Sequence, residues 1–342
     1  EEKVGQMFFV RCPDEDAVKQ VSEYNIGGYI LFGRDFDGKT KDEVVDDIHS
    51  YQNEADIPLL IGVDEEGGTV VRVSSNPNLR ETPFLSPKDT YADGGWDAVK
   101  QDAEEKADLL LSLGINVNLA PVCDMTSDEY GFMYDRSFSS DVDMENRYVR
   151  TVVETSKSKK LGTVLKHFPG YGNNSDTHTG IAHDDRYYSE FENTDFKPFY
   201  QGIESGADCI LVSHNIVNCM DSEYPASLSQ KVHDILRNEF KFDGVIMTDD
   251  LIMDAITDFT GDEAAAVTAA KCGNDLLCCS SVDTQYPAVL EAVQNGEISE
   301  TQVDASVKRI LKWKQNLGIF NIDTYQKKVK STEPTDTVGS EE

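Results

Sequence analysis

Asp176 and His178 are two residues apart in a polar loop, and their types could together do acid and base chemistry. A carboxylate beside an imidazole can orient the ring, favour its charged form and move its pKa towards neutrality. The pair therefore has the make-up of a proton-transfer group. An Asp-Thr-His sequence by itself more often has a structural role, in which the aspartate side chain accepts a hydrogen bond from the backbone of its own turn and the histidine is solvated. Both interpretations stay open.

A second acidic group, Asp249, stands at the end of the apolar run 244–248. A carboxylate fixed at the end of a rigid strand, near arginine and lysine side chains, stays ionised and can attack an electrophilic carbon. Asp250 is a second candidate for this role on sequence alone. Capping of the following helix is the alternative role for Asp249.

The elements that must position these groups are visible as short apolar runs along the chain. Eight runs recur, at residues 7–10, 29–32, 59–63, 117–120, 163–165, 210–212, 245–247 and 276–279. Segments with helical spacing of apolar residues lie between most of them or follow them, at residues 41–54, 96–113, 142–160, 196–205, 228–240, 261–272, 285–295 and 300–316. Short buried strands that alternate with helices pair in parallel through right-handed crossovers. Eight such units predict an α/β fold, a closed (β/α)₈ TIM-type barrel.

The C-terminal ends of the strands carry the active site in such a barrel. Charged residues and a histidine follow several of the predicted strands at this end: Asp64 and Arg72 after the third, Arg136 beyond the fourth, Lys166 and His167 after the fifth, and Asp249 after the seventh. Gathered at one rim, these groups would form a pocket rich in charge pairs.

The motifs GGYILFGR, GVDEEGG with Arg72, YDRSF, KHFPGYG with DTH, PASLS and GVIMTDDL occur in this order between roughly residues 3 and 317. Together they resemble the β-N-acetylglucosaminidase (NagZ-like) branch of the family 3 glycoside hydrolases. The resemblance implies a retaining, exo-acting β-N-acetylglucosaminidase that works through a covalent glycosyl-aspartate and needs neither cofactor nor metal. Its implied substrates are cell-wall muropeptide fragments or chitin-type oligosaccharides that contain N-acetylglucosamine.

The resemblance also assigns roles to individual residues. The nucleophile falls on Asp249, and the proton donor and acceptor on His178, oriented by Asp176. The positions that bind the sugar are Asp64, Arg72, Arg136, Lys166 and His167. Two residues depart from the usual pattern: Tyr171 stands where many relatives have a histidine, and Glu65 where they often have glutamine. We expect these changes to affect what lies beyond the first sugar.

Composition limits the other classes of function. The 63 acidic and 31 basic residues give a net charge of −32, which argues against nucleic acid or an anionic membrane surface as a partner. Mean hydropathy is −0.45, and no apolar run approaches the roughly 20 residues that span a bilayer. The seven cysteines include no CxxC pair, so a structural zinc site is not expected. We expect a monomer whose partner is its sugar substrate.

The sequence leaves four alternatives open. Two of them keep the family resemblance: another family 3 β-glycosidase, such as a β-glucosidase or β-xylosidase, and a phosphorylase that passes the sugar to phosphate. The other two belong to different classes: a metal-dependent hydrolase with His167, His178 and Asp176 as ligands, and an inactive sugar-binding protein.

We expect one catalytic domain over residues 1–325 and a mobile acidic tail over 326–342. The first residue is Glu1 rather than methionine, which favours a processed, extracytoplasmic protein, with the cytoplasm as the alternative.

Overall fold

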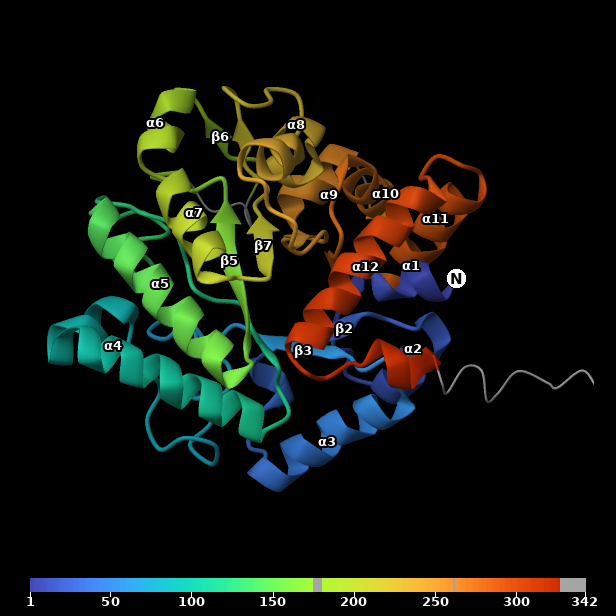
Figure 1. Ribbon diagram of the computed structural model, residues 1–342, viewed down its shortest axis with the longest axis horizontal. Helices are drawn as coiled ribbons and strands as arrows, with labels where there is room; N and C mark the ends of the chain where they lie inside the picture. Colours follow the sequence, from blue (N-terminus) through green and yellow to red (C-terminus); the bar gives the residue numbers. More distant parts are fainter. Residues whose placement is uncertain (175–179, 261, 327–342) are drawn as a thin grey trace, which may run out of the picture.

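The structure is a computed structural model that describes residues 1–174, 180–260 and 262–326 (Figure 1). The expected tail at 326–342 therefore lies almost entirely outside the described residues. Asp176 and His178 also lie outside them.

Eight parallel strands form the centre of the molecule, as the alternation of apolar runs predicts. They are β1 (Phe8–Arg11), β2 (Gly28–Leu31), β3 (Leu60–Val63), β4 (Val117–Asn118), β5 (Gly162–Phe168), β7 (Cys209–Val212), β9 (Val245–Thr248) and β10 (Leu277–Cys279). Their order in the sheet is β10-β1-β2-β3-β4-β5-β7-β9. A parallel bridge between Met247 and Leu276 joins the two outer strands and closes the barrel.

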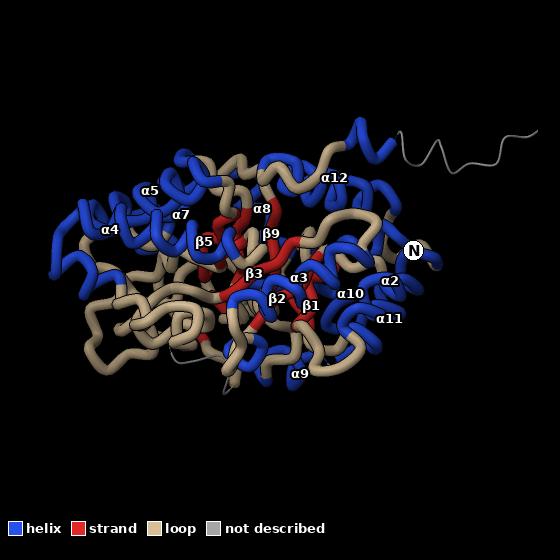
Figure 2. The backbone as a smooth tube through the Cα atoms, turned by 90° about the horizontal axis from the view of Figure 1, so that it is seen from below, coloured by secondary structure: helices blue, strands red, loops and turns tan. Residues whose placement is uncertain are grey.

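Helices connect successive strands and surround them, so that the strands lie at the centre in Figure 2. The connecting helices are α2 (Ala17–Tyr24), α3 (Lys41–Glu54), α4 (Pro87–Ser112), α5 (Val142–Lys159), α7 (Phe196–Ser205), α8 (Gln230–Asp234), α10 (Asp262–Cys272) and α11 (Val282–Gln294). Neighbours such as α4 with α5, and α10 with α11, pack side by side (Figure 1). The predicted (β/α)₈ barrel is confirmed.

The remaining elements lie at the two ends of the barrel or extend the helices. They are α1 (Glu2–Gln6), α6 (Tyr188–Asn193), α9 (Asp254–Thr260), α12 (Glu300–Asn316), the short turns η1 (Gly33–Asp35), η3 (Ala226–Leu228) and η4 (Ile235–Glu239), and the pair β6 (His183–Asp184) with β8 (Ile216–Val217). Of the predicted helices, 228–240 is divided among η3, α8 and η4. Residues 96–113 form the second part of α4, which Gly94 and Gly95 interrupt with non-helical backbone.

The barrel interior is packed with apolar side chains rather than left open. The ring of Phe9 fills the space beside Gly62 in β3, where a Cβ atom would lie 2.5 Å from the Cζ atom of Phe9. Leu119 approaches the same glycine from the next strand, at 3.0 Å. This filling closes the floor of the barrel, so a ligand can enter only at the mouth.

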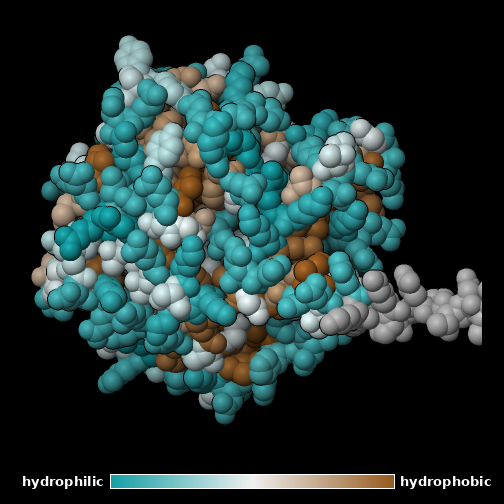
Figure 3. All heavy atoms as spheres, in the orientation of Figure 1, coloured by the Kyte–Doolittle hydropathy of each residue, from teal (hydrophilic) through white to brown (hydrophobic). Residues whose placement is uncertain are grey.

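The face of the molecule in Figure 3 is mostly hydrophilic, with apolar atoms confined to small patches. This surface agrees with the large excess of acidic residues. Within the described part of the chain, no helix combines the length and the apolar character that crossing a bilayer requires.

Candidate active site

A pocket of about 590 Å³ opens at the C-terminal ends of the strands. All eight barrel strands contribute to its lining, either directly or through the residue that follows them. Most of the sugar-site residues predicted from the sequence line it: Asp64, Arg72, Arg136, Lys166, His167 and Asp249. The apolar side chains of Ile30, Leu119 and Leu211 and the thiol of Cys278 complete the lining. The structure therefore brings together predicted site residues that are up to 185 positions apart in the sequence, the separation of Asp64 and Asp249.

Lys166 lies at the centre of the charged network. Its Nζ atom is 2.5 Å from Oδ1 of Asp64 and 2.6 Å from Oε1 of Glu66, and its side chain is only 2% exposed. Burial by itself would lower the pKa of Lys166, but the charges of Asp64 and Glu66 raise it above its usual value. The ammonium group therefore stays charged and fixes the carboxylate of Asp64 in one orientation.

Glu66 joins Lys166 to Arg136. Its oxygens accept hydrogen bonds from Nη2 and Nε of Arg136 at 2.8 and 3.0 Å, which is a bidentate pair. Burial by itself would raise the pKa of Glu66, but Lys166 and Arg136 outweigh it and hold the pKa well below its usual range. Glu66 does not line the pocket. It is a positioning residue that holds two side chains which do, and sequence reasoning assigned it no role.

His167 is held by Asp124, which follows the fourth strand. Nδ1 of the ring lies 2.7 Å from Oδ2 of Asp124, and the same oxygen accepts the backbone N–H of His167 at 3.0 Å. The other oxygen of Asp124 accepts the backbone N–H of Tyr171 at 2.7 Å. Nε2 of His167 lies 3.3 Å from Nη2 of Arg136, so both ring nitrogens have polar neighbours.

The surroundings of His167 are relevant to the alternative of a metal-dependent hydrolase, in which His167 would be a metal ligand. Its Nδ1 atom faces the carboxylate of Asp124, and its Nε2 atom faces the guanidinium of Arg136. Its two other proposed ligands, Asp176 and His178, lie outside the described residues. Over residues 1–174, 180–260 and 262–326, no group of three or more His, Cys, Asp or Glu side chains is placed to hold a metal ion.

Asp249 follows β9 directly, and its backbone N–H donates to the carbonyl of Val212 at 3.2 Å. Oδ1 of Asp249 accepts the backbone N–H of Asp250 at 2.9 Å, which fixes the side chain of Asp249 against the start of the loop. Asp250 also lines the pocket, but one of its oxygens accepts a hydrogen bond from Ser280 at 2.5 Å. Burial raises the pKa of Asp250 above its usual value. His214 bonds Ser227 and the carbonyl of Asp250 from a fully buried position, which is a structural role.

Glu65 acts on the loop that carries Arg72. Its buried carboxylate accepts the backbone N–H groups of Arg72, Val73 and Ser74 at 2.9, 2.7 and 3.3 Å. The side chain therefore faces away from the pocket and sets the turn from which Arg72 enters it. The expectation that Glu65 acts beyond the first sugar has no support here, whereas Tyr171 does line the pocket.

Asp176 and His178 lie in sequence between β5, which belongs to the barrel, and β6, which pairs with β8 in a separate two-stranded sheet. Arg186 ties down the returning end, because it contacts Asp184 at 2.8 Å and Asp195 at 2.9 Å. Oδ1 of Asp195 lies close to Gly170, which has a φ of 120° at the start of the loop. Arg186 and Asp195 thus join the two described ends of this loop, and Tyr171 at the first end lines the pocket.

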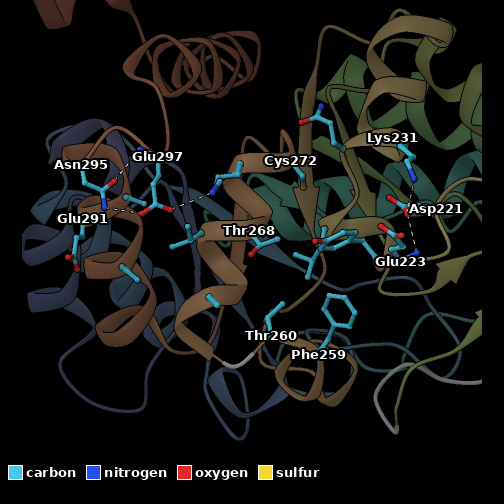
Figure 4. A pocket seen from close by; sticks show the side chains of 18 residues that line it. Asp221, Glu223, Lys231, Phe259, Thr260, Thr268, Cys272, Glu291, Asn295 and Glu297 are labelled. Carbon is cyan, nitrogen blue, oxygen red and sulfur yellow. Dashed lines mark hydrogen bonds and ion pairs between the residues drawn. The ribbon is translucent and has the colours of Figure 1, made fainter.

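A larger hollow, of about 1030 Å³, lies on the outside of the barrel between α8, α10 and α11 (Figure 4). Its lysines are already paired, Lys231 with Asp221 at 3.2 Å and Lys271 with Glu297 at 3.5 Å. It contains no convergent set of charged groups comparable to the pocket at the mouth. Volume alone is therefore a poor guide here, and the convergence of charged groups makes the pocket at the mouth of the barrel the candidate active site.

Residues 1–313 match the family model described as the glycosyl hydrolase family 3 N-terminal domain. The chain belongs to glycoside hydrolase family 3. A protein of Nitrosomonas eutropha named β-hexosaminidase is 32% identical over 273 residues, which cover 78% of this chain and 77% of that protein. One of Hydrogenovibrio crunogenus with the same name is 31% identical and covers 81% and 79%.

Solved structures of the family share the fold. The family 3 β-N-acetylglucosaminidase from Paenibacillus sp. FPU-7 superimposes with a TM-score of 0.87 and 30% identity over 93% of this chain. The chain spans 62% of the length of that structure. The resemblance found in the sequence motifs is confirmed at the level of the family.

Proposed function

We propose that this family 3 glycoside hydrolase is a retaining, exo-acting β-N-acetylglucosaminidase. The observation that carries the proposal is the pocket at the mouth of the barrel, which Asp249 lines together with the fixed Asp64, Lys166 and Arg136. A pocket with a packed floor suits removal of one terminal sugar rather than cleavage within a chain. The names of the two bacterial relatives and of the Paenibacillus structure support the choice of an N-acetylhexosamine.

In the proposed mechanism an oxygen of Asp249 attacks the anomeric carbon of the sugar, and the bond from that carbon to the leaving oxygen breaks. His178, oriented by Asp176, gives its proton to the leaving oxygen. Water then attacks the same carbon, His178 takes a proton from the water, and Asp249 is released as a carboxylate. The roles of His178 and Asp176 rest on the sequence motif, because both lie outside the described residues.

Asp64, Lys166, His167, Arg136 and Arg72 supply the donors and acceptors that hold the sugar hydroxyl and acetamido groups. An ionised carboxylate such as Asp64 can accept hydrogen bonds from two neighbouring hydroxyl groups. We propose cell-wall muropeptide fragments or chitin-type oligosaccharides as the natural substrates. Transfer of the sugar to phosphate, and action on a β-glucoside or β-xyloside, are the alternatives.

A panel of aryl β-glycosides tests the proposal. The N-acetylglucosaminide should be cleaved at least a hundredfold faster than the glucoside and xyloside, with net retention of anomeric configuration by NMR. Phosphate should not change the product. Formation of a sugar 1-phosphate would identify a phosphorylase, and preference for the glucoside or xyloside would overturn the sugar assignment. For Asp249→Ala we expect loss of all turnover, and mass spectrometry of the wild type with a slow aryl substrate should locate the sugar adduct on Asp249.

A further inference from the structure

One corner of the pocket contains a cation that neither the sequence motifs nor the mechanism uses. Arg11 is the last residue of β1 and lines the pocket beside Phe32, which follows β2. The guanidinium carbon of Arg11 lies 4.6 Å from the centroid of the Phe32 ring. That of Arg72 lies 5.9 Å from the same centroid. Two guanidinium groups therefore share one aromatic ring at the wall of the pocket.

Neither arginine forms an ion pair with a described carboxylate. Among the residues that the structure describes, no carboxylate lies within ion-pair distance of either guanidinium, and the buried Nε atom of each has no hydrogen-bond acceptor. Lys166 and Arg136 in the same pocket are paired with Asp64 and Glu66. Acidic residues outnumber basic ones two to one in this chain, so a shortage of carboxylates does not explain the two unpaired arginines.

The geometry also suits a particular kind of ligand. When a guanidinium group stacks on an aromatic ring, its planar face contacts the ring and its N–H groups point outwards in its own plane. There they can donate hydrogen bonds to two oxygens at once. A neutral hydroxyl would satisfy a hydrogen bond but leave the charge uncompensated, whereas an oxyanion satisfies both.

We propose that Arg11, with Arg72 and Phe32, forms an oxyanion-binding corner that recognises a carboxylate or phosphate group on the ligand. A sugar that spans from Asp249 to Asp64 would present one edge to β1 and β2, and the negative group would be a substituent on that edge, so that the preferred terminal sugar is an acidic derivative of N-acetylglucosamine. This inference rests on the proposed function for the orientation of the sugar. Arg11 would then determine specificity between neutral and acidic ligands.

The nearby carboxylates Asp249 and Asp250 suggest a competing role for Arg11. Both line the same pocket, and the charge of Arg11 acts to lower the pKa of Asp250, against the effect of burial. If Arg11 served only to keep these groups ionised, its removal would weaken turnover of every substrate alike. It would also move the acid limb of the pH–rate profile to higher pH, and that pattern would count against the proposal.

Calorimetric binding tests the corner without relying on catalysis. The probes are N-acetylglucosamine, its 6-phosphate, N-acetylmuramic acid and inorganic phosphate, each titrated into wild type, Arg11→Lys and Arg11→Met. Arg34→Met is the matched control, because Arg34 is paired with Asp14 at 2.8 Å and does not line the pocket.

We expect wild type to bind at least one acidic sugar ten times more tightly than the neutral sugar. Arg11→Met should reduce that preference at least tenfold, Arg11→Lys should reduce it less, and Arg34→Met should leave it in place. Tight binding of inorganic phosphate alone would assign the corner to a free anion rather than to a group on the sugar. No preference in wild type, or equal losses for neutral and acidic probes in Arg11→Met, would overturn the proposal. Failure to cleave any aryl glycoside would overturn the proposed function but leave this measurement intact.

Discussion

Glu66 holds Arg136 with both of its carboxylate oxygens, at 2.8 and 3.0 Å, although Glu66 itself does not reach the pocket. The same carboxylate contacts Lys166 at 2.6 Å. Glu66 therefore sets the relative positions of two cations, Lys166 and Arg136, that line the pocket. The shape of this wall of the pocket depends on a residue that does not line it.

Replacement of Glu66 by glutamine should lower kcat/KM for the aryl N-acetylglucosaminide at least tenfold. The change removes the negative charge that both Lys166 and Arg136 contact, and it leaves Asp64 as a carboxylate partner of Lys166 alone. Breaking a buried pair on one side typically costs about 3–5 kcal/mol. Steady-state kinetics measure the fall in kcat/KM, and thermal unfolding measures the loss of stability separately. Asp135→Asn, at an exposed position on the rim, is the control and should lose less than threefold. Wild-type kinetics in Glu66→Gln would show that the network does not matter for substrate binding.

Asp124 is expected to matter because it positions the imidazole of His167. In Asp124→Asn the amide can still accept one hydrogen bond, but it no longer carries the charge that faces Nδ1 of His167 at 2.7 Å. We expect KM for the aryl substrate to rise five- to fiftyfold with a smaller change in kcat. A fall in kcat with constant KM would contradict a purely positioning role.

His178→Ala separates proton donation from nucleophilic attack. A leaving group of low pKa needs no proton at departure, so an aryl substrate with a nitrophenol leaving group should retain far more activity than a natural disaccharide. We expect the loss of activity on the natural disaccharide to exceed the loss on the aryl substrate by more than a hundredfold. Asp176→Ala should change the same ratio in the same direction, more weakly, because it removes only the group that orients the imidazole. Equal losses on both substrates would remove His178 from the acid role.

The sequence predicts the barrel well, because its signal is local: each strand is a short apolar run and each helix has its own apolar period. The pocket residues follow from the same logic, since Asp64, Lys166 and Asp249 each come at the end of such a run. Arg11 also ends a strand, but nothing in its neighbourhood distinguishes it from a solvated arginine until Phe32 lies beside it. The partnerships of Glu66 with Arg136 and of Asp124 with His167 join residues 70 and 43 positions apart, and only the closed barrel brings them together.

Lys314 offers a measurable link between pH and stability at the opposite end of the barrel. Its side chain in α12 is fully buried, and its Nζ atom donates to Oε1 of the neutral Gln6 in α1 at 2.8 Å. Burial lowers the pKa of Lys314 to about 7, whereas a lysine in the unfolded chain titrates near 10.4. Between these two values the unfolded chain binds one proton more than the folded chain, so this lysine makes the free energy of unfolding rise with pH.

Lys314→Met removes that titration and keeps an apolar side chain of similar length. The free energy of unfolding of wild type relative to Lys314→Met should therefore increase between pH 7.5 and 9.5, by up to about 1.4 kcal/mol per pH unit. Urea denaturation followed by circular dichroism at several pH values measures the difference. Lys312→Met is the matched control, because Lys312 in the same helix is 63% exposed and should show no such trend. Parallel stability curves for wild type and Lys314→Met would mean that Lys314 keeps its proton in the folded protein over this range, and the buried ammonium would then need a stronger acceptor than Gln6.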